Sequence, residues 1–334
     1  MEDSVVNIGI TLTAPFWYFE GEIVRCWVPL DPSEYGQCEL KVCEVFRRVI
    51  THIYGGVLIL VSLPVAVLGH GLMELGMYLG ASDIQSSSGL QSERVNNKPK
   101  ILHLNTCMFP GSLPIHFGGM SPASFRIPEL VGWILQQDAD IVMLGEVGDL
   151  AAGKIEKRLK NYYTHFYTKI GMKPFGMGAS LFIASRLPCD QIDFTEYSVR
   201  ADGSQKFMKR GFVTMDLGEM VLFYTHLHPG GGDKDDQMRE AQLTEIRGAM
   251  DQVSNEKKVM LAGDLNIDYR KSDFLVRHNF TWIGDKREGE SRLGELSDYI
   301  LSGSGKVDAF AVSYIELNGL SDHPGVLVAP CQRV

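Results

Sequence analysis

The residues best suited to chemistry are Asp264 and Asn266, within the stretch Val259-Met-Leu-Ala-Gly-Asp-Leu-Asn-Ile-Asp268. Mostly apolar residues precede Asp264, a pattern typical of a buried strand that ends in a carboxylate. Side chains two positions apart lie on one face of a strand, so this carboxylate and this amide could bind the same ligand. Gly-Asp-Leu-Asn is also typical of an ordinary turn, and the tetrad alone does not choose between the two.

Apolar segments that end in a polar residue recur along residues 100–330, between predicted helices at 125–137, 154–159 and 237–253. In layered α/β domains, functional sites are assembled where strands end at one edge. A single strand-terminal Asn, Asp or His is more often a turn former or a structural residue, but eight in series are difficult to attribute to turns. The eight are Asn105, Glu146, His226, Asp264, Asn266, Asp298, Asp322 and His323.

In order, this series resembles the endonuclease/exonuclease/phosphatase superfamily, whose fold is DNase I-like. The resemblance covers roughly residues 100–330 and implies an α/β four-layer sandwich, with two mixed β-sheets packed face to face and flanked by helices. A hydrophobic N-terminal region precedes it. The motifs are Leu104-Asn105, Gly145-Glu146, Gly178 to Pro188, Thr225-His-Leu-His228, Arg239-xx-Gln242, Gly263-Asp-Leu-Asn266, Ser297-Asp-Tyr-Ile300 and Ser321-Asp-His-Pro324.

A metal site is expected among the oxygen-bearing residues of this series. Oxygen ligands without Cys or clustered His favour a hard divalent ion, Mg²⁺ or Mn²⁺. The resemblance implies that Glu146 is the principal metal ligand, with Asn105 beside it, and that Asp322 completes the cluster at a second metal position.

The same resemblance implies roles for the other five residues in the hydrolysis of a phosphoester by in-line attack of water. Asp264 would position the water, and Asn266 would donate to the transition-state oxygens. His323 would act as general base, oriented by Asp298, because a carboxylate partner fixes the tautomer of a His and raises its basicity. His226 would contact the phosphate and stabilise the leaving oxygen.

One position departs from the family pattern. Many members carry a Gln before the metal-binding Glu, and here that position is Gly145. A supporting hydrogen bond is therefore expected to be lost, while every core chemical position remains filled.

Residues 1–81 form a separate N-terminal region. Pro15 is expected to act as a breaker in its first part, and residues 1–52 suggest no chemistry. The apolar stretch from Ile53 to Leu79 contains no Asp, Glu, Lys or Arg except Glu74. Its length favours membrane association, and a buried core helix is the alternative.

The topology of the run at 53–79 is open at this point. A single span would place the C-terminal part across the membrane from the N-terminus, which Arg47 and Arg48 would keep cytoplasmic. A re-entrant hairpin, turning at Pro64 and Gly69-His-Gly71, would leave both parts in the cytoplasm. The polar, Ser/Asn-rich residues 82–99 are predicted to be a linker, and residues 100–334 the catalytic domain.

Charge bears on the substrate. Net charge is -9, with 6 Lys+Arg against 11 Asp+Glu in residues 1–99 and 26 against 30 in residues 100–334. A nuclease needs basic patches to bind backbone phosphates, so this charge argues mildly against duplex nucleic acid, while a local patch around Lys206, Lys209 and Arg210 stays open. Six scattered Cys without CxxC spacing favour free thiols over zinc or disulfides.

We therefore expect a Mg-dependent phosphodiesterase with a membrane lipid such as sphingomyelin as substrate. The apolar run would bring the site to a bilayer, and the combination of this run with the motifs is similar to neutral sphingomyelinases. Nucleases and phosphoinositide phosphatases share the motifs and remain alternatives. A hypothesis of another class is a catalytically silent, membrane-anchored interaction protein. Oligomeric state does not follow from the sequence.

Overall fold

The chain divides into two compact units, and each is described by itself. The first comprises Met1–Ser82 and Met108–Arg126, and the second comprises Asp83–Cys107 and Ile127–Val334. A computed structural model describes residues 2–25, 37–79, 83–91, 98–108, 120–121, 123–172, 178–199, 208–268, 270, 273–283, 297–303 and 310–330.

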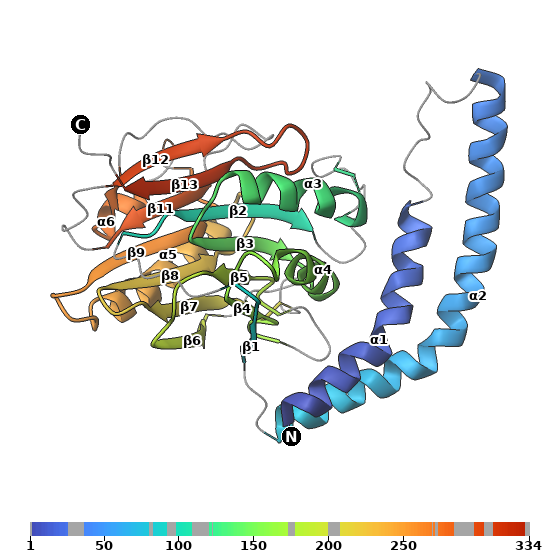
Figure 1. Ribbon diagram of the computed structural model, residues 1–334, viewed down its shortest axis with the longest axis horizontal. Helices are drawn as coiled ribbons and strands as arrows, with labels where there is room; N and C mark the ends of the chain where they lie inside the picture. Colours follow the sequence, from blue (N-terminus) through green and yellow to red (C-terminus); the bar gives the residue numbers. More distant parts are fainter. Residues whose placement is uncertain are drawn as a thin grey trace. The chain divides into compact units, whose positions relative to one another are not determined.

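Two long helices make up most of the first unit, α1 (Glu2–Arg25) and α2 (Gln37–Tyr78) (Figure 1). Pro15 lies inside α1, so its prediction as a breaker was wrong. A proline removes one helical hydrogen bond and bends a helix, and packing along a neighbouring helix can offset that cost. The predicted turn at Pro64 and Gly69–Gly71 does not form either, because α2 runs through these residues without interruption.

The part of α2 from Glu44 to Gly76 is long and apolar enough to cross a membrane. Only 22% of its most apolar 18 residues are buried within the structure. A core helix of a soluble protein would bury most of such a stretch, so the alternative of a buried core helix is not favoured.

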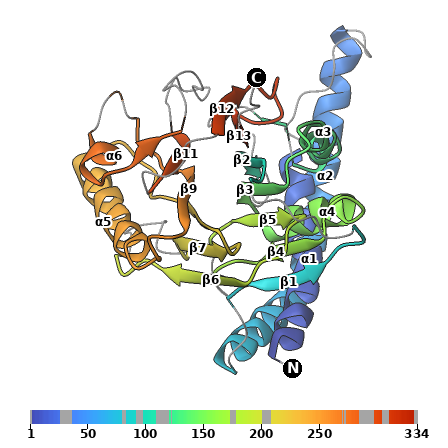
Figure 2. The same ribbon diagram turned by 60° about the vertical axis from the view of Figure 1, so that its left-hand side comes forward.

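The second unit contains a seven-stranded sheet and a six-stranded sheet (Figure 2). The first sheet has the order β1 (Gln85–Ser88), β4 (His165–Thr168), β5 (Phe182–Ser185), β3 (Ile141–Val147), β2 (Ile101–Met108), β13 (Gly325–Pro330) and β12 (Phe310–Ile315). β1 falls inside the segment predicted to be a linker. An edge strand pairs through its main chain, so polar side chains such as those of β1 do not prevent it from joining β4.

The second sheet has the order β10 (Thr281–Trp282), β11 (Asp298–Ser302), β9 (Lys258–Asp264), β8 (Met220–His226), β7 (Gly211–Asp216) and β6 (Gln191–Glu196). β8 and β9 are parallel, because helix α5 (Asp233–Met250) connects them in a crossover. The other strand pairs of this sheet are antiparallel, as for β9 with β11.

The two sheets pack against each other across one hydrophobic core. Along β9, Met260 and Ala262 enter this core with residues of the first sheet such as Met143. Val259 and Leu261 point to the opposite face and pack with α5 and the short helix α6 (Phe274–Arg277) in a second core. Both faces of the strand are buried, which explains the nearly continuous apolar run in its sequence.

Two further helices cover the outer face of the first sheet, the part of α3 (Ala123–Gln136) from Ile127 onward and α4 (Asp149–Leu159) (Figures 1 and 2). The Trp133 ring of α3 closes over β13, where a side-chain carbon on Gly325 would lie 2.5 Å from it. Helices, sheet, sheet and helices therefore form four layers. The predicted fold class, a DNase I-like sandwich preceded by an apolar helix, is confirmed.

Candidate active site

Three neighbouring strands of the second sheet place polar residues in one row. The parallel register of β8 and β9 puts His226 beside Asp264, and the antiparallel register of β9 and β11 puts Asp298 on the other side of Asp264. All three side chains are buried, with residue exposures of 4%, 2% and 2%. The strand pairing therefore assembles residues that are up to 72 positions apart in the sequence.

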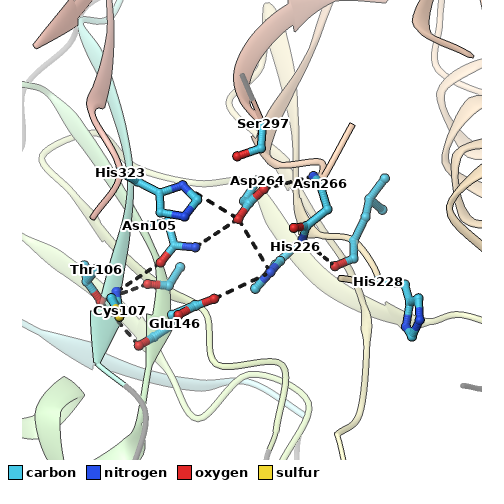
Figure 3. Close-up of polar contacts among 12 residues, drawn as sticks. Asn105, Thr106, Cys107, Glu146, His226, His228, Asp264, Asn266, Ser297 and His323 are labelled. Atoms are coloured by element: carbon cyan, nitrogen blue, oxygen red, sulfur yellow. Dashed lines mark hydrogen bonds and ion pairs between the residues drawn. The ribbon is translucent and has the colours of Figure 1, made fainter. Parts of the chain in front are cut away.

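The first sheet supplies Asn105, within β2, and Glu146, near the end of β3. The amide of Asn105 donates to Asp264 Oδ2 at 2.9 Å, which connects the two sheets through one hydrogen bond (Figure 3). Glu146 has a φ of +55°, a conformation that is unfavourable for a residue with a long side chain. Such strain persists where the surroundings hold it, and it is frequent at functional sites.

Two residues reach the site from loops, Asn266 after β9 and His323 before β13. The Asn266 main-chain amide donates to Asp264 Oδ1 at 2.9 Å, and its side-chain amide donates to the Leu227 carbonyl at 3.1 Å. The Ser321 hydroxyl donates to the Asn105 carbonyl at 2.6 Å and accepts from the His323 main-chain amide at 3.1 Å. Both loops are therefore fixed to strand ends of the site.

The Asp298 carboxylate lies between two imidazoles. His323 Nδ1 is 2.5 Å from Oδ2, and His103 Nε2 is 2.8 Å from Oδ1. Burial raises the pKa of Asp298, but the two His rings together outweigh burial and hold it well below its usual range. For His323, burial lowers the pKa, but the adjacent carboxylates, Asp298 first, outweigh burial and hold it well above the usual range. The Nδ1 contact leaves Nε2 as the ring nitrogen that can exchange a proton with a bound reactant.

Glu146 and Asp264 are two acids that burial makes difficult to ionise. Burial and then the charge of Asp264 raise the pKa of Glu146 to about 8. Burial and then Asp298 raise the pKa of Asp264. A cation between these carboxylates would remove the repulsion and favour their charged forms.

A divalent cation fits this donor set. Ligand atoms of Glu146, His226 and Asp264 lie within 4.8 Å of one another, as do those of Asp264, Asp298 and His323. His226 Nε2 is 3.9 Å from Glu146 Oε1 and 3.7 Å from Asp264 Oδ2 (Figure 3). Burial and then the charge of Arg210 keep the pKa of His226 well below its usual range. A neutral imidazole with two carboxylates is a donor set typical of divalent metals.

Hydrogen bonds from α5 and from a buried arginine fix the segment that carries His226. The Arg210 guanidinium donates to the carbonyls of His226 and Leu227 at 3.0 and 2.9 Å. Arg239 donates to the carbonyl of His228, and Gln242 accepts from the main-chain amide of His228. The Arg239-xx-Gln242 motif therefore positions a loop.

Comparison of the sequence with protein families identifies the family of this chain. The sequence model described as "Endonuclease/Exonuclease/phosphatase family" matches residues 111–323, more than half of the chain. The chain belongs to this family. A search of curated proteins found no match.

The fold of this family member is similar to that of several solved structures. Sphingomyelinase C from Streptomyces griseocarneus has a TM-score of 0.56 and 18% identity, over 70% of this chain and 100% of that one. Beta toxin 275-280 from Staphylococcus aureus has a TM-score of 0.58 and 16% identity, over 70% and 99%. Humanized D. rerio TDP2 has a TM-score of 0.52 and 18% identity, over 70% and 98%. At these identities the likeness is one of fold.

Seven of the eight predicted site residues lie together in this member of the family, joined by the contacts described above. They are Asn105, Glu146, His226, Asp264, Asn266, Asp298 and His323. Asp322 is not a member of either group of potential metal ligands among the described residues, and its Oδ1 lies 3.4 Å from the Ser321 hydroxyl. The roles of all eight stay predictions.

Sequence reasoning missed two buried residues of the site, His103 and Arg210. Their side chains are adjacent to the catalytic candidates, but neither residue is part of a motif that resembles the family. His103 lies two residues before Asn105 on the same strand, so it shares a face with that residue, and this period-2 spacing is the signal that could have found it. Arg210 gives no comparable signal, because its main-chain partners lie on another strand.

Proposed function

We propose that the protein is a Mg²⁺-dependent phosphodiesterase that hydrolyses a membrane phospholipid, with sphingomyelin as its substrate. The observation that carries the proposal is the cluster of Glu146, His226 and Asp264 beside the Asp298–His323 pair. Metal-ligating groups next to a carboxylate-oriented His are the parts required for attack of water on a phosphoester.

Glu146 and Asp264, with Asn105 beside them, are the residues that would hold the metal. When bound, the metal would neutralise charge on the phosphoryl oxygens, which these acids would otherwise repel. Mn²⁺ would suit the same oxygen-rich donors.

The chain's own groups would orient and deprotonate the water. In its neutral form His323 would accept the proton at Nε2, because Asp298 holds Nδ1 at 2.5 Å and stabilises the imidazolium that forms. Asp264 would orient the water through its carboxylate, and the Asn266 amide would donate to the phosphoryl oxygens. His226, kept neutral by burial and by Arg210, would donate a hydrogen bond to the phosphate and the leaving oxygen.

A lipid substrate is supported by the apolar helix α2 and by the charges of the catalytic unit. Lys209 forms ion pairs with Asp83 at 2.6 Å and Glu196 at 3.9 Å, and Arg210 is buried behind His226. Lys206 lies outside the described residues. Two of the three cations proposed as a patch for nucleic acid are therefore engaged within the protein. Two of the solved structures of similar fold are a sphingomyelinase C and a beta toxin.

The test uses the full chain in vesicles that contain sphingomyelin, with phosphoinositide vesicles and single- and double-stranded DNA as competing substrates. We expect release of phosphocholine that requires Mg²⁺ and stops on chelation. Rapid cleavage of DNA or phosphoinositide without phosphocholine release would reject the lipid proposal and favour the corresponding alternative.

Two variants separate the enzyme from a catalytically silent interaction protein. His323→Ala should lower the rate by several orders of magnitude, whereas His278→Ala, which changes a partly exposed His outside the site, should leave it unchanged. Equal activity of His323→Ala and the unmodified chain would contradict the proposed mechanism.

A further inference from the structure

The helices α1 and α2 pack against each other in opposite directions along much of their length. A side-chain carbon on Gly76, near the end of α2, would lie 2.5 Å from Val6 Cγ2, near the start of α1. A carbon on Gly55, early in α2, would lie 2.7 Å from Ile23 Cγ1, late in α1. The two helices are therefore an antiparallel hairpin (Figure 1).

Most of the buried residues that the structure describes in the two helices are small. A side-chain carbon on Gly9 would lie 2.5 Å from the Gly69 carbonyl oxygen, so the two backbones nearly touch there. Such close approach through small residues is typical of helix pairs in membranes, where Gly, Ala, Ser and Thr line the contacts. The small buried residues are Gly9 and Thr13 on α1 and Gly55, Ser62, Ala66, Gly69 and Gly76 on α2.

The outer surface of the pair has the opposite composition. Large apolar side chains of α2 point away from α1, and Ile53, Leu60 and Val61 are each 67–69% exposed. The hydroxyls of Thr13 and Ser62 donate to carbonyls of their own helices, at 2.9 and 3.0 Å. In a water-soluble hairpin the large apolar residues would fill the contact instead, because their burial is the main source of stability.

The charged residues of the two helices bound a common uncharged band. On α1 the 16 residues from Ser4 to Phe19 contain no Asp, Glu, Lys or Arg, and on α2 the 25 residues from Val49 to Met73 contain none. At 1.5 Å per residue these stretches measure about 24 and 38 Å, compared with about 30 Å for the hydrocarbon core of a bilayer.

Because the helices are antiparallel, the two uncharged stretches coincide at one end, and at the other end the stretch of α2 extends beyond that of α1. The Glu2 carbonyl oxygen lies 3.0 Å from the position of a side-chain carbon on Gly76, two residues after Glu74. At the other end, the Phe19 carbonyl oxygen lies 3.9 Å from the corresponding position on Gly55, seven residues after Arg48. Acidic residues therefore flank one end of the band, and charges of both signs flank the other.

We infer that α1 and α2 enter the bilayer together as a helical hairpin, with the Glu2 end of α1 and the catalytic unit on the same side of the membrane. The sidedness follows because α2 ends at Tyr78, beside the start of α1, and the second unit begins only five residues later at Asp83. This inference rests on the membrane association in the proposed function and is independent of the substrate.

Sidedness is tested on the full chain, expressed with one epitope tag before Glu2 and another after the last residue. One portion of sealed membrane vesicles is treated with protease, and a separate portion is extracted with alkaline carbonate. We expect retention in the membrane and the same fate for both tags, either both cleaved or both protected. Retention with opposite fates would overturn the hairpin while leaving membrane association intact. Release by carbonate would overturn both.

The helix contact is tested separately with the pair Val6→Cys and Gly76→Cys, whose sulfur atoms should come within disulfide reach. We expect a cross-linked product that requires both introduced Cys. Gly69→Leu should lower its yield at least tenfold, because the new side chain would collide with α1. Gly71→Leu, at a position with no atom within 4 Å, should not. A missing cross-link, or an equal effect of the two Leu substitutions, would overturn the proposed hairpin.

Discussion

His103 Nε2 lies 2.8 Å from Asp298 Oδ1, on the opposite side of the carboxylate from His323. The His103 side chain is fully buried, and its ring meets that of Tyr224 edge to face at 5.6 Å. Asp298 is thus fixed through both of its oxygens. The partner of the candidate general base has no freedom to turn, which keeps the His323 ring in one orientation.

His103→Ala should therefore lower activity by about tenfold to a hundredfold, the usual effect of removing such a supporting group. The same substitution leaves Asp298 Oδ1 without its hydrogen-bond donor, which should lower the free energy of unfolding by about 1–3 kcal/mol. His103→Gln, which keeps an N–H donor, should recover part of the loss in kcat. Measurement of kcat, KM and urea unfolding for both variants, with His278→Ala as control, checks this. Equal kcat for His103→Ala and the unmodified chain would contradict the positioning role.

Gly145 faces the hydroxyl of Tyr224, where a side-chain carbon would lie 3.5 Å away. That distance is an ordinary contact, so Gly145→Ala should be tolerated. Gly145→Gln, which introduces the residue common in the family, needs space that Tyr224 occupies, and it should destabilise the protein by about 1–3 kcal/mol.

Tyr224→Phe removes only the hydroxyl, so it should recover part of the cost of Gly145→Gln. The measurement is the free energy of unfolding for both single variants and the double variant. Strictly additive costs would show that the two positions do not compete for space.

Gly263 has a φ of +149°, and a side-chain carbon there would lie 1.9 Å from the Thr225 carbonyl oxygen on β8. Gly263→Ala should lower the free energy of unfolding by about 3 kcal/mol and displace Asp264, because β8 and β9 would have to separate. Gly153→Ala, on the exposed face of α4 with no atom within 4 Å, should instead stabilise by about 1 kcal/mol. Chemical unfolding of both variants gives the comparison, and equal effects would contradict the close approach.

The raised pKa of Glu146 predicts how pH affects metal binding. Below about pH 8 the carboxyl group is protonated in the metal-free protein, so a proton competes with the metal. The affinity for Mg²⁺ should therefore rise about tenfold per pH unit up to pH 8 and then level off. Glu146→Gln should weaken binding and remove this dependence. Titration calorimetry between pH 6 and pH 9 checks it, and an affinity that does not change with pH would contradict it.

The same carboxyl group affects the stability of the metal-free protein. A folded pKa above the unfolded value stabilises the fold below the unfolded pKa, and this contribution is lost as pH rises through about 8. The Tm without metal should fall from pH 5 to pH 8 more steeply for the unmodified chain than for Glu146→Gln. Added Mg²⁺ should reverse the fall at pH 8. Parallel Tm curves for the two proteins would contradict this assignment.

The sequence by itself determined the class of fold and most members of the site. Apolar segments that lead to Asn105, Glu146 or Asp264 carry their signal locally, because the burial of a strand is visible in its neighbouring residues. The ordered series of motifs also determined the family. The apolar character of α2 followed from composition alone.

Only the tertiary structure decided which of these residues meet and which others support them. His226, Asp264 and Asp298 become neighbours through strand register, a property of pairing between distant segments. His103 and Tyr224 belong to different sheets, so the contact between their rings and the space beside Gly145 exist only after the sheets pack. In α2, the contrast between small buried residues and large exposed ones gains meaning only from the helix packed beside it. These contacts depend on how side chains from distant parts of the sequence fit together, which local sequence patterns do not encode.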